Sequence, residues 1–569
     1  MNITTSIRRL SILFIVLFIA ASAGLVYWQV VVAQQVSTNP SMTLSRHCLP
    51  DSTPKRGNIY DRNGVLLAYS EPIPVNTNNP NVDKLCVYQR VYTHPSMASV
   101  LGYYVSPVFC AISPYCEAGI EKQYDDYLSG RVGFTGLNNT YNQLLHQPPV
   151  GDNIYLTIDV RIQDIVYKDF SEEAPSVGLN DVFKTDRGSV IVTDPHTGQI
   201  LAMVSSPFYD PNRIASGDLD YLQSLLSNPE QPLLNRAIND CYAPGSSYKT
   251  LTLMAALDSG KFTLDSPFYN DHDPAHMQAI GPVRLGAGDT TETFGPTGNN
   301  ITGYTFNFPV NLIYGYTHSD NIIFAQVGAN TGPATWLDYN HAFFVNKQIP
   351  FDLPVSVSTV TPQQKLCAST PSPETPLSVV QLAENSYGQG VDFVTPLQMS
   401  LFDDAAANNG QLMRPTLIDK IEDSSKSVLK SFTATVLDNP ISQTTAAEVR
   451  DSMYGVVSCG SGSLTRVQLS YPYSRWSVIG KTGTAQVNST GLTPAQSWFI
   501  TAAPYVYQSN SLPAITITAM KENGGEGAYA NGPMLRDIYQ SIFTQVLTNV
   551  QQPPPPDPNF CFNTNLLQR

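Results

Sequence analysis

The sequence predicts a mixed α/β protein of the α+β type, held to a membrane by a single helix near its N-terminus. Residues 10–33 contain no charged side chain, and about 20 apolar residues suffice to cross the hydrocarbon core of a bilayer. In the rest of the chain, short strand-like runs are separated by turn-rich segments, which is typical of antiparallel sheet. Apolar stretches between these runs predict buried helices.

Length and charge narrow the class of protein. The chain has 569 residues and 42% hydrophobic content, so two or three globular domains are expected. The net charge is −14, and no basic run is present. Nucleic-acid binding is therefore not expected, because it requires Lys and Arg side chains to neutralise phosphates. The acidity is better explained by solubility.

The uncharged stretch is interpreted as a membrane anchor over residues 10–33. Arg8 and Arg9 precede it, and the next basic residue is Arg46. The positive-inside rule then places residues 1–9 in the cytoplasm and the bulk of the chain outside. Small residues at 21–24 leave a cleaved signal peptide as the alternative. The apolar run continues past them, which favours an uncleaved, single-pass anchor.

Residues 34–180 are expected to form an elongated N-terminal domain. The dipeptide Asn63-Gly64 lies between two apolar stretches and predicts a β-hairpin. Residues 119–130 predict a short amphipathic helix that ends at a glycine. Residues 151–159 predict a strand, after which Asp159 caps a helix from residue 160 to about 173.

Residues 181–550 are expected to form the second and larger domain. Its strand-like runs are residues 188–194, 199–205, 476–485, 497–503 and 514–520. Its principal helices are predicted from Ser246 onward, from residue 321 to about 330, and from 533 to 550. Residues 270–310 are rich in Gly, Thr, Asn and Asp and indicate loops. Residues 551–569 include four consecutive prolines and predict an extended, disordered tail.

The eight cysteines permit disulfides in an exported chain. Sequence alone leaves their connectivity open, with Cys110 and Cys116 as the most plausible local pair. Cys241 is interpreted as a structural cysteine, in a disulfide or in buried packing, rather than as a catalytic thiol. No Cys-x-x-Cys or His-Glu-x-x-His pattern occurs, so neither a metal nor another cofactor is expected.

The chemistry is predicted to centre on Ser246. This residue opens an apolar helix, and Lys249 lies three residues later on the same face, where it can take the serine proton. The start of a helix also favours developing negative charge. The same spacing occurs at Ser52–Lys55 and Ser427–Lys430. Pro54 interrupts the first of these, and the second lies in a polar stretch that indicates a turn or an exposed edge.

Two further motifs accompany Ser246. Ser319-Asp320-Asn321 begins a predicted helix, and Lys481-Thr482-Gly483-Thr484 lies on a predicted strand. The order of the three motifs resembles that of the penicillin-recognising serine enzymes. The segments Arg56–Gly64 and Asp194–Met203, together with Gly388-Gln389-Gly390, narrow the resemblance to class B penicillin-binding proteins, which are monofunctional peptidoglycan D,D-transpeptidases. The resemblance extends from about residue 56 to residue 550.

This resemblance implies a transpeptidase domain with a five-stranded antiparallel sheet flanked by helices, beside an all-helical lobe, on a pedestal domain. Ser246 would attack the penultimate D-Ala of a stem peptide, and an amine of a second stem would resolve the acyl-enzyme. β-Lactams would acylate the same serine. The implied partners are therefore peptidoglycan stem peptides and β-lactams, with a membrane-embedded glycan polymerase as a further one.

Each motif residue receives a role from its chemistry and from the resemblance. Lys249 would be the base, with its pKa lowered by burial and by Lys481. Ser319 would pass the proton to the leaving amine. The expected catalytic residues are Ser246, Lys249, Ser319 and Lys481. The expected substrate-binding residues are Asn321, Thr482, Gly483 and Thr484. Backbone N–H groups of Ser246 and Thr484 would form the oxyanion hole.

Three other functions fit the sequence less well. A class A β-lactamase needs a Glu-x-x-Leu-Asn motif, which is absent between Asn321 and Lys481. An antibiotic sensor that is acylated by β-lactams needs a cytoplasmic effector, and only residues 1–9 are expected inside. An inactive scaffold for wall synthesis does not require intact motifs.

The long interval between Ser246 and Ser319 indicates an insertion near residues 280–305.

Overall fold

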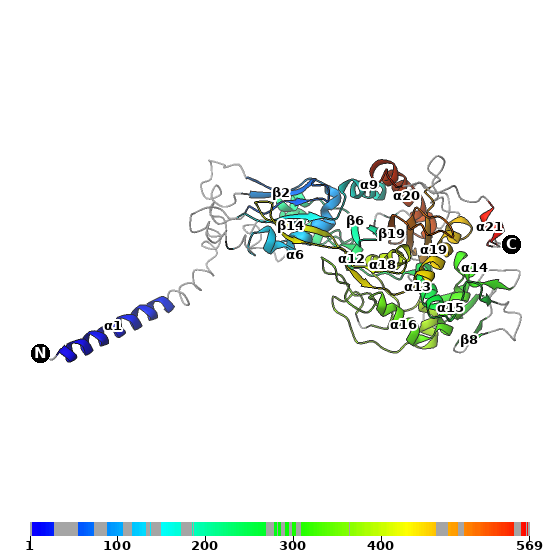
Figure 1. Ribbon diagram of the computed structural model, residues 1–569, viewed down its shortest axis with the longest axis horizontal. Coiled ribbons are helices and arrows are strands. Elements are labelled where there is room, and N and C mark those ends of the chain that lie inside the picture. Colours follow the sequence, from blue (N-terminus) through cyan, green and yellow to red (C-terminus); the bar gives the residue numbers. More distant parts are fainter. Residues whose placement is uncertain are drawn as a thin grey trace.

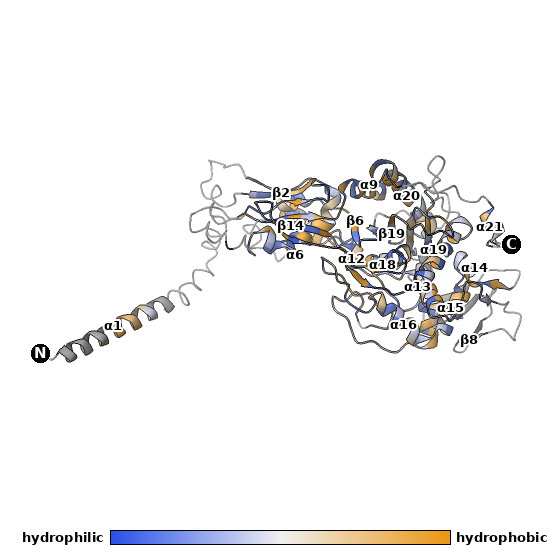
Figure 2. Ribbon diagram, in the orientation of Figure 1, coloured by the Kyte–Doolittle hydropathy of each residue, from blue (hydrophilic) through white to orange (hydrophobic). Residues whose placement is uncertain are grey.

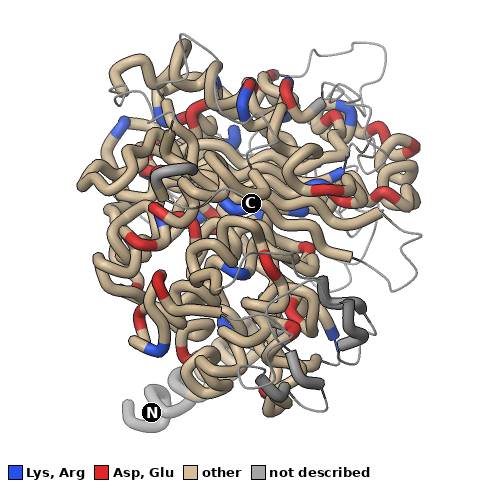
Figure 3. Tube along the Cα trace, turned by 90° about the vertical axis from the view of Figure 1, so that its right-hand side faces the viewer, with Lys and Arg blue, Asp and Glu red and all other residues tan. Residues whose placement is uncertain are grey.

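The computed structural model of the chain describes residues 3–27, 55–72, 88–105, 116–132, 137, 150–171, 185, 187–268, 278–280, 283–285, 291–294, 299–302, 309–363, 365–462, 476–486, 494–550, 559–564 and 566. Within these residues, two sheets organise the protein: a six-stranded sheet and a five-stranded sheet that is surrounded by helices (Figure 1). Acidic and basic residues are interspersed along the trace (Figure 3).

Helix α1 (Ile3–Val26) covers the beginning of the expected membrane anchor. The side chains of α1 that can be described are largely hydrophobic and exposed, Phe14 and Phe18 among them (Figure 2). Among the described residues, no helix reaches the combination of length and apolar character that a membrane crossing needs. Residues 28–33 of the expected span lie outside the described residues.

The six-stranded sheet has the order β15-β14-β4-β1-β2-β3. Its strands are β1 (Ile59–Tyr60), β2 (Leu66–Pro72), β3 (Tyr88–Tyr92), β4 (Asn153–Leu156), β14 (Ile418–Glu422) and β15 (Val428–Ser431). The hairpin predicted at Asn63-Gly64 joins β1 to β2. The Asp61 carboxylate accepts bonds from the backbone N–H groups of Asn63 and Val65, at 2.8 and 2.7 Å, and so fixes this turn.

Strands β14 and β15 come from residues 418–431, far along the chain from the other members of this sheet. β14 pairs antiparallel with β4, and β4 pairs parallel with β1. The sequence did not indicate that residues 418–431 pair with the strands of the first domain. The expected domain bounds, 34–180 and 181–550, stay a prediction. The helix expected at 119–130 is also two helices, α6 (Gly119–Gln123) and α7 (Asp125–Leu128), because the backbone leaves helical geometry at Tyr124.

The five-stranded sheet is antiparallel throughout and has the order β17-β18-β19-β5-β6. It contains every strand predicted for the second domain. The strands are β5 (Gly188–Asp194), β6 (Gln199–Ser206), β17 (Ile479–Ala485), β18 (Gln496–Ala503) and β19 (Ile515–Lys521). Nearly every residue in them is buried, because helices cover both faces.

Two helices cover one face of this sheet. Helix α9 (Val160–Ser171) begins after Asp159, as predicted, and it packs with α20 (Gly527–Ser541) over Val190 and Val192. Helix α18 (Pro396–Ala407) covers the opposite face, where it contacts β5, β18 and β19 and packs on the side of Ile191 and Met520.

Further helices pack against one another beside the sheet. Helix α13 contacts α15, α16 and α19, and α15 contacts α17. The helices of this group are α13 (Lys249–Asp258), α14 (Leu312–Thr317), α15 (Asn321–Thr331), α16 (Pro333–Ala342), α17 (Val379–Asn385) and α19 (Gln443–Ser458). The buried Trp336 indole donates to Thr252 Oγ1 at 3.1 Å and joins α16 to α13.

Short elements complete the described fold. The helical ones are η2 (Pro95–Met97), α4 (Ala98–Leu101), α10 (Pro211–Ala215), α11 (Leu219–Leu226), α12 (Arg236–Asn239), η3 (Gly245–Tyr248), η6 (Ile542–Val546) and α21 (Phe560–Asn563). The strands are β7 (Pro267–Phe268), β8 (Gln278–Ile280), β9 (Val283–Leu285), β10 (Thr291–Phe294), β11 (Asn299–Thr302), β12 (Val310–Asn311), β13 (Leu412–Met413) and β16 (Val436–Asp438).

Three expectations from the sequence were wrong. Residues 270–310 contain two hairpins, β8–β9 and β10–β11, rather than loops alone. Helix α20 begins at Gly527 instead of 533, because the Glu526 side chain caps it by accepting from the Tyr529 N–H. The segment after the proline run is not disordered throughout, since Phe560 and Leu566 are buried and Cys561 is bonded to Cys459. Residues 551–558 lie outside the described residues.

Candidate active site

Ser246 lies in the 3-10 turn η3, directly before α13, so its hydroxyl stands at the start of a buried helix. Gly245 has a φ of 56° and donates its N–H to Gly388 O at 2.9 Å. A Cβ at Gly245 would lie 2.7 Å from Thr484 O. A glycine is therefore needed there to bring Ser246 against strand β17.

Lys249 contacts three of the predicted site residues. Its Nζ donates to Ser246 Oγ at 2.7 Å and to Asn321 Oδ1 at 2.6 Å, and it lies 3.4 Å from Ser319 Oγ. The side chain is fully buried. Burial and, next, the neighbouring Lys481 ammonium hold the pKa of Lys249 well below its ordinary value, while Asp320 opposes them. These are the two causes expected from the sequence, and they favour the neutral amine that a general base requires.

Ser319 stands between the two lysines. Lys481 Nζ donates to Ser319 Oγ at 2.8 Å, and Lys249 Nζ lies 3.4 Å from the same oxygen. The residue has a φ of 62°, in the left-handed region that side chains rarely adopt. The Asp320 carboxylate caps α15 by accepting from the Ile323 N–H at 2.9 Å. The strained backbone is thus held by a helix cap on its C-terminal side, as is common at functional sites.

Strand β17 supplies the remaining motif. Burial lowers the pKa of Lys481 to about 7, although the Glu526 carboxylate raises it. A Cβ at Gly483 would lie 2.8 Å from Pro244 O, so only glycine lets the strand pass the Ser246 turn at this distance. Thr484 Oγ1 accepts from the Gly527 N–H at 3.0 Å, which leaves its hydroxyl proton available to a substrate carboxylate.

The structure therefore brings the three predicted motifs together. Lys249 contacts Ser246, Ser319 and Asn321, and Lys481 contacts Ser319. Thr482, Gly483 and Thr484 follow on the adjacent strand. In the described part of the chain, no cluster of His, Cys, Asp and Glu could hold a metal ion.

The alternative serine–lysine pairs lack such surroundings. Ser427 is exposed at the turn before β15, as expected from its polar context, and the Lys430 ammonium lies over the Phe432 ring at 4.6 Å. Ser52 lies outside the described residues.

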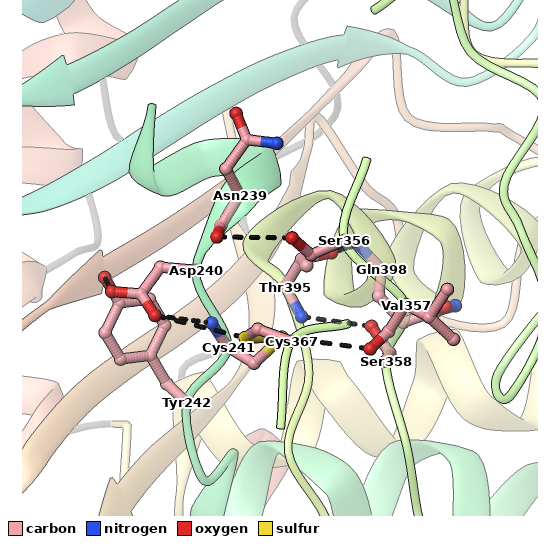
Figure 4. Close-up of a disulfide and its surroundings, with 10 residues drawn as sticks. All are labelled: Asn239, Asp240, Cys241, Tyr242, Ser356, Val357, Ser358, Cys367, Thr395 and Gln398. Carbon is pink, nitrogen blue, oxygen red and sulfur yellow. Dashed lines mark hydrogen bonds between the residues drawn. A yellow bond between two sulfur atoms is a disulfide. The ribbon is translucent and has the colours of Figure 1, made fainter. Parts of the chain in front are cut away.

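Cys241 is bonded to Cys367, which confirms its structural interpretation (Figure 4). The bridge joins the strand-like segment before Ser246 to the segment that leads to α17. Backbone and side-chain bonds run beside it, from Ser356 Oγ to Asn239 O at 3.3 Å and from Tyr242 Oη to Asp240 Oδ2 at 2.9 Å. Cys116 is also disulfide-bonded. Cys110 lies outside the described residues, so the expected Cys110–Cys116 pair stays a prediction.

Sequence reasoning missed several residues that hold the site. Gln389 Nε2 donates to Thr484 O at 3.0 Å, and Ser461 Oγ lies 3.0 Å from Thr482 Oγ1. His318 Nε2 lies 2.9 Å from Leu566 O. Gln389 belongs to the Gly-Gln-Gly segment noted for its resemblance. No local pattern marks Ser461 or Leu566, because both reach the site only through tertiary contacts.

The antiparallel sheet, the serine with its buried lysine and the two further motifs together define a penicillin-recognising serine enzyme. Comparison agrees, since the family described as penicillin binding protein transpeptidase domain matches residues 188–540. The chain belongs to this family, and the expected relationship to class B penicillin-binding proteins is confirmed.

Two curated relatives and one solved structure illustrate the similarity. The peptidoglycan D,D-transpeptidase PbpA of Mycolicibacterium smegmatis is 29% identical over 545 residues, which cover 93% of this chain and 96% of the relative. MrdA of Escherichia coli K12, also a peptidoglycan D,D-transpeptidase, is 28% identical over 74% of this chain and 64% of its own length. The ceftriaxone acyl-enzyme of penicillin-binding protein A from M. tuberculosis superposes with a TM-score of 0.67 at 25% identity, over 88% of this chain and 99% of that one.

Proposed function

We propose that the protein is a peptidoglycan D,D-transpeptidase that cross-links stem peptides through an acyl-enzyme on Ser246. The observation that carries the proposal is the contact of a fully buried, low-pKa Lys249 with Ser246 Oγ at 2.7 Å. Membership of the family and the printed function of its relatives support it. β-Lactams would inhibit the enzyme by acylating the same oxygen, and the description of the similar structure as a ceftriaxone acyl-enzyme complex supports this.

In the first half-reaction, neutral Lys249 would take the proton of Ser246 Oγ while this oxygen attacks the penultimate D-Ala carbonyl. Backbone N–H groups of Ser246 and Thr484 would stabilise the resulting oxyanion. As the peptide bond breaks, the proton would pass from Lys249 through Ser319 to the leaving D-Ala amine. The contact of Lys249 with Ser319 Oγ, at 3.4 Å, supports this path.

In the second half-reaction, the amine of another stem peptide would attack the Ser246 ester. Lys249 would take a proton from that amine, and Ser246 would leave as the alkoxide and be reprotonated. One peptide bond is thus exchanged for another, without a metal or an oxidant. The cross-link forms at the carbonyl that had carried the terminal D-Ala.

Five residues are proposed to bind the donor peptide. Asn321 would hold a substrate amide, using the Nδ2 donor that remains when its Oδ1 accepts from Lys249. Lys481 would attract the terminal carboxylate, and Thr482, Gly483 and Thr484 would bind it along strand β17. The open hydroxyl proton of Thr484 supports this assignment.

Labelling with a fluorescent penicillin, followed by peptide mapping, tests the proposal. The label is expected on the peptide that contains Ser246, and Ser246→Ala should abolish it. Mapping to any other serine, or persistent labelling of Ser246→Ala, would show that the site is wrong. Conversion of a stem-peptide donor and an amine acceptor into a cross-linked dimer then separates a transpeptidase from a sensor or a scaffold.

For the location, we propose a single-pass membrane protein with a cytoplasmic N-terminus and an extracytoplasmic catalytic part. The uncharged stretch 10–33 and the Arg8-Arg9 pair before it support this. The same location would allow a membrane-embedded glycan polymerase to act as a partner. The protein should fractionate with membranes and keep its N-terminus, and a mature N-terminus near Gly24 would contradict an uncleaved anchor.

A further inference from the structure

We propose that the C-terminal segment, residues 559–564 together with Leu566, positions the active site by holding Ser319 through His318 and Thr482 through Ser461. The inference rests on the proposed roles of these two site residues. It assigns a function to described residues that lie beyond the matched family region, which ends at residue 540.

The C-terminal segment is firmly attached to the end of α19. Cys561 is bonded to Cys459, which directly follows that helix. The Phe560 ring makes edge-on contacts with Tyr454 and Tyr507, with centroid distances of 4.7 and 4.6 Å. Phe560 is 6% exposed and Leu566 is 1% exposed. A segment with only a surface role would not bury these side chains.

The first connection runs from Leu566 to Ser319. His318 Nε2 lies 2.9 Å from Leu566 O, and since a carbonyl can only accept, the imidazole donates this bond. His318 is buried, and burial lowers its pKa, which favours the neutral ring. Ser319 follows His318 directly and has the left-handed φ of 62°. The bond therefore fixes the N-terminal side of a strained residue whose other side is fixed by the α15 cap.

The second connection runs from the disulfide to Thr482. Cys459 is followed by Gly460, where a Cβ would lie 1.9 Å from Thr317 O. Ser461 then donates its N–H to Thr317 O at 3.2 Å, and its Oγ lies 3.0 Å from Thr482 Oγ1. The Cys459–Cys561 disulfide thus holds the tight turn at Gly460 and Ser461, and Ser461 contacts Thr482 on strand β17.

Both connections meet at Thr317. Its carbonyl accepts from the Ser461 N–H, and its neighbour His318 donates to Leu566 O. A Cβ at Gly455 would lie 2.8 Å from Thr317 Oγ1 and 3.2 Å from Leu566 Cδ1, so all three residues are packed at one point. A displacement of the C-terminal segment would therefore move Ser319 and Thr482 together.

The simpler alternative is that the segment only stabilises the fold, since a disulfide constrains the unfolded chain. The two roles differ in their effect on the folded enzyme. A loss of stability leaves the folded molecules as reactive as before. A loss of positioning slows the chemical step in molecules that are fully folded, and misplacement by about 1 Å can cost about a hundredfold in rate.

The test measures acylation of the full-length protein by a fluorescent penicillin over a range of concentrations, well below the unfolding temperature. This separates the limiting acylation rate from the apparent binding constant. His318→Leu removes the donor to Leu566 and leaves the Cys459–Cys561 disulfide in place. His318→Gln keeps an N–H donor at the same distance from the backbone. His341→Leu is the matched control, because this histidine contacts Glu374 away from the site.

His318→Leu should lower the limiting rate between about tenfold and a hundredfold, with a smaller change in the binding constant. His318→Gln should recover most of the rate, and His341→Leu should match the wild type. The double variant Cys459→Ser/Cys561→Ser should resemble His318→Leu. The proposal is overturned if His318→Leu acylates at the wild-type rate, or if His318→Gln falls as far as His318→Leu. Failure of the wild type to be labelled at Ser246 would instead refute the proposed function.

Discussion

Removing the charge of Lys481 should move the pH dependence of acylation toward alkaline pH. In the proposed mechanism acylation requires the neutral amine of Lys249, so the acylation rate should rise as the pH passes the pKa of this residue. The Lys481 ammonium is one of the two causes that lower this pKa. Without this charge, the protonated form of Lys249 is less disfavoured, so the pKa of Lys249 rises. The ascending limb of the pH–rate profile then moves to higher pH.

The size of the shift follows from the geometry. Both ammonium groups contact Ser319 Oγ, at 3.4 Å from Lys249 and 2.8 Å from Lys481, so they lie no more than about 6 Å apart. At an effective dielectric constant of about 20, two unit charges about 6 Å apart repel by about 3 kcal/mol, which corresponds to about two pH units. Since the pKa of Lys481 is itself about 7, its charge is partial near neutrality, and a shift between about one and two pH units is expected.

The assay is the pH dependence of β-lactam acylation in three variants. Lys481→Met removes the charge and keeps a long apolar side chain in place, which preserves the burial of Lys249. Lys481→Ala removes the charge and admits water, which weakens desolvation and moves the limb in the same direction. Lys481→Arg keeps the charge but not the compact ammonium, so its limb should stay near that of the wild type. An unchanged or acid-shifted limb in Lys481→Met would refute the electrostatic reasoning.

Three further predictions concern other parts of the molecule. Ser427→Ala should leave penicillin labelling at the wild-type level, and a loss of label in a folded variant would point to a different nucleophile. Gly388→Ala should reduce the acylation rate more than tenfold, because its Cβ would lie 1.9 Å from Gly245 O at a φ of 80°; normal kinetics would show that the Ser246 turn tolerates displacement. Trp336→Ala should lower the free energy of unfolding by about 3–5 kcal/mol, measured by denaturant titration, and a loss below about 1 kcal/mol would contradict its role in joining α16 to α13.

Much of the site could be predicted because its signals are local. The serine–lysine spacing, the residue types at the start of α15 and the strand pattern around Lys481 each depend on a few neighbouring residues. The sequence also predicted that burial and Lys481 lower the pKa of Lys249, which is the direction found in the structure. The sequence did not indicate that one oxygen, Ser319 Oγ, contacts both lysines. This contact depends on how α13, α15 and β17 pack together.

The missed features depend on long-range pairing. Cys459 and Cys561 are 102 residues apart, and no spacing rule selects them from the other cysteines. The proline run in the sequence gives no information about the burial of Phe560, which follows it. The hairpins within 270–310 are short, and the Gly- and Thr-rich composition of this segment indicated loops instead of strands. The sequence pattern placed the start of α20 at Pro533, because proline favours the first turn of a helix, whereas Pro533 lies inside α20.

The return of residues 418–431 to the first sheet has a consequence for dividing the molecule. β14 bonds to β4 along one side, with Ile418 opposite Leu156 and Ile421 opposite Ile154. A recombinant fragment that starts near residue 181 would lack β4 and would expose this side of β14, with its unpaired N–H and C=O groups and two isoleucines that are buried in the whole protein. Such an open strand edge recruits other chains. The catalytic half expressed alone is therefore expected to self-associate, and a soluble fragment needs β4 and β1 as well.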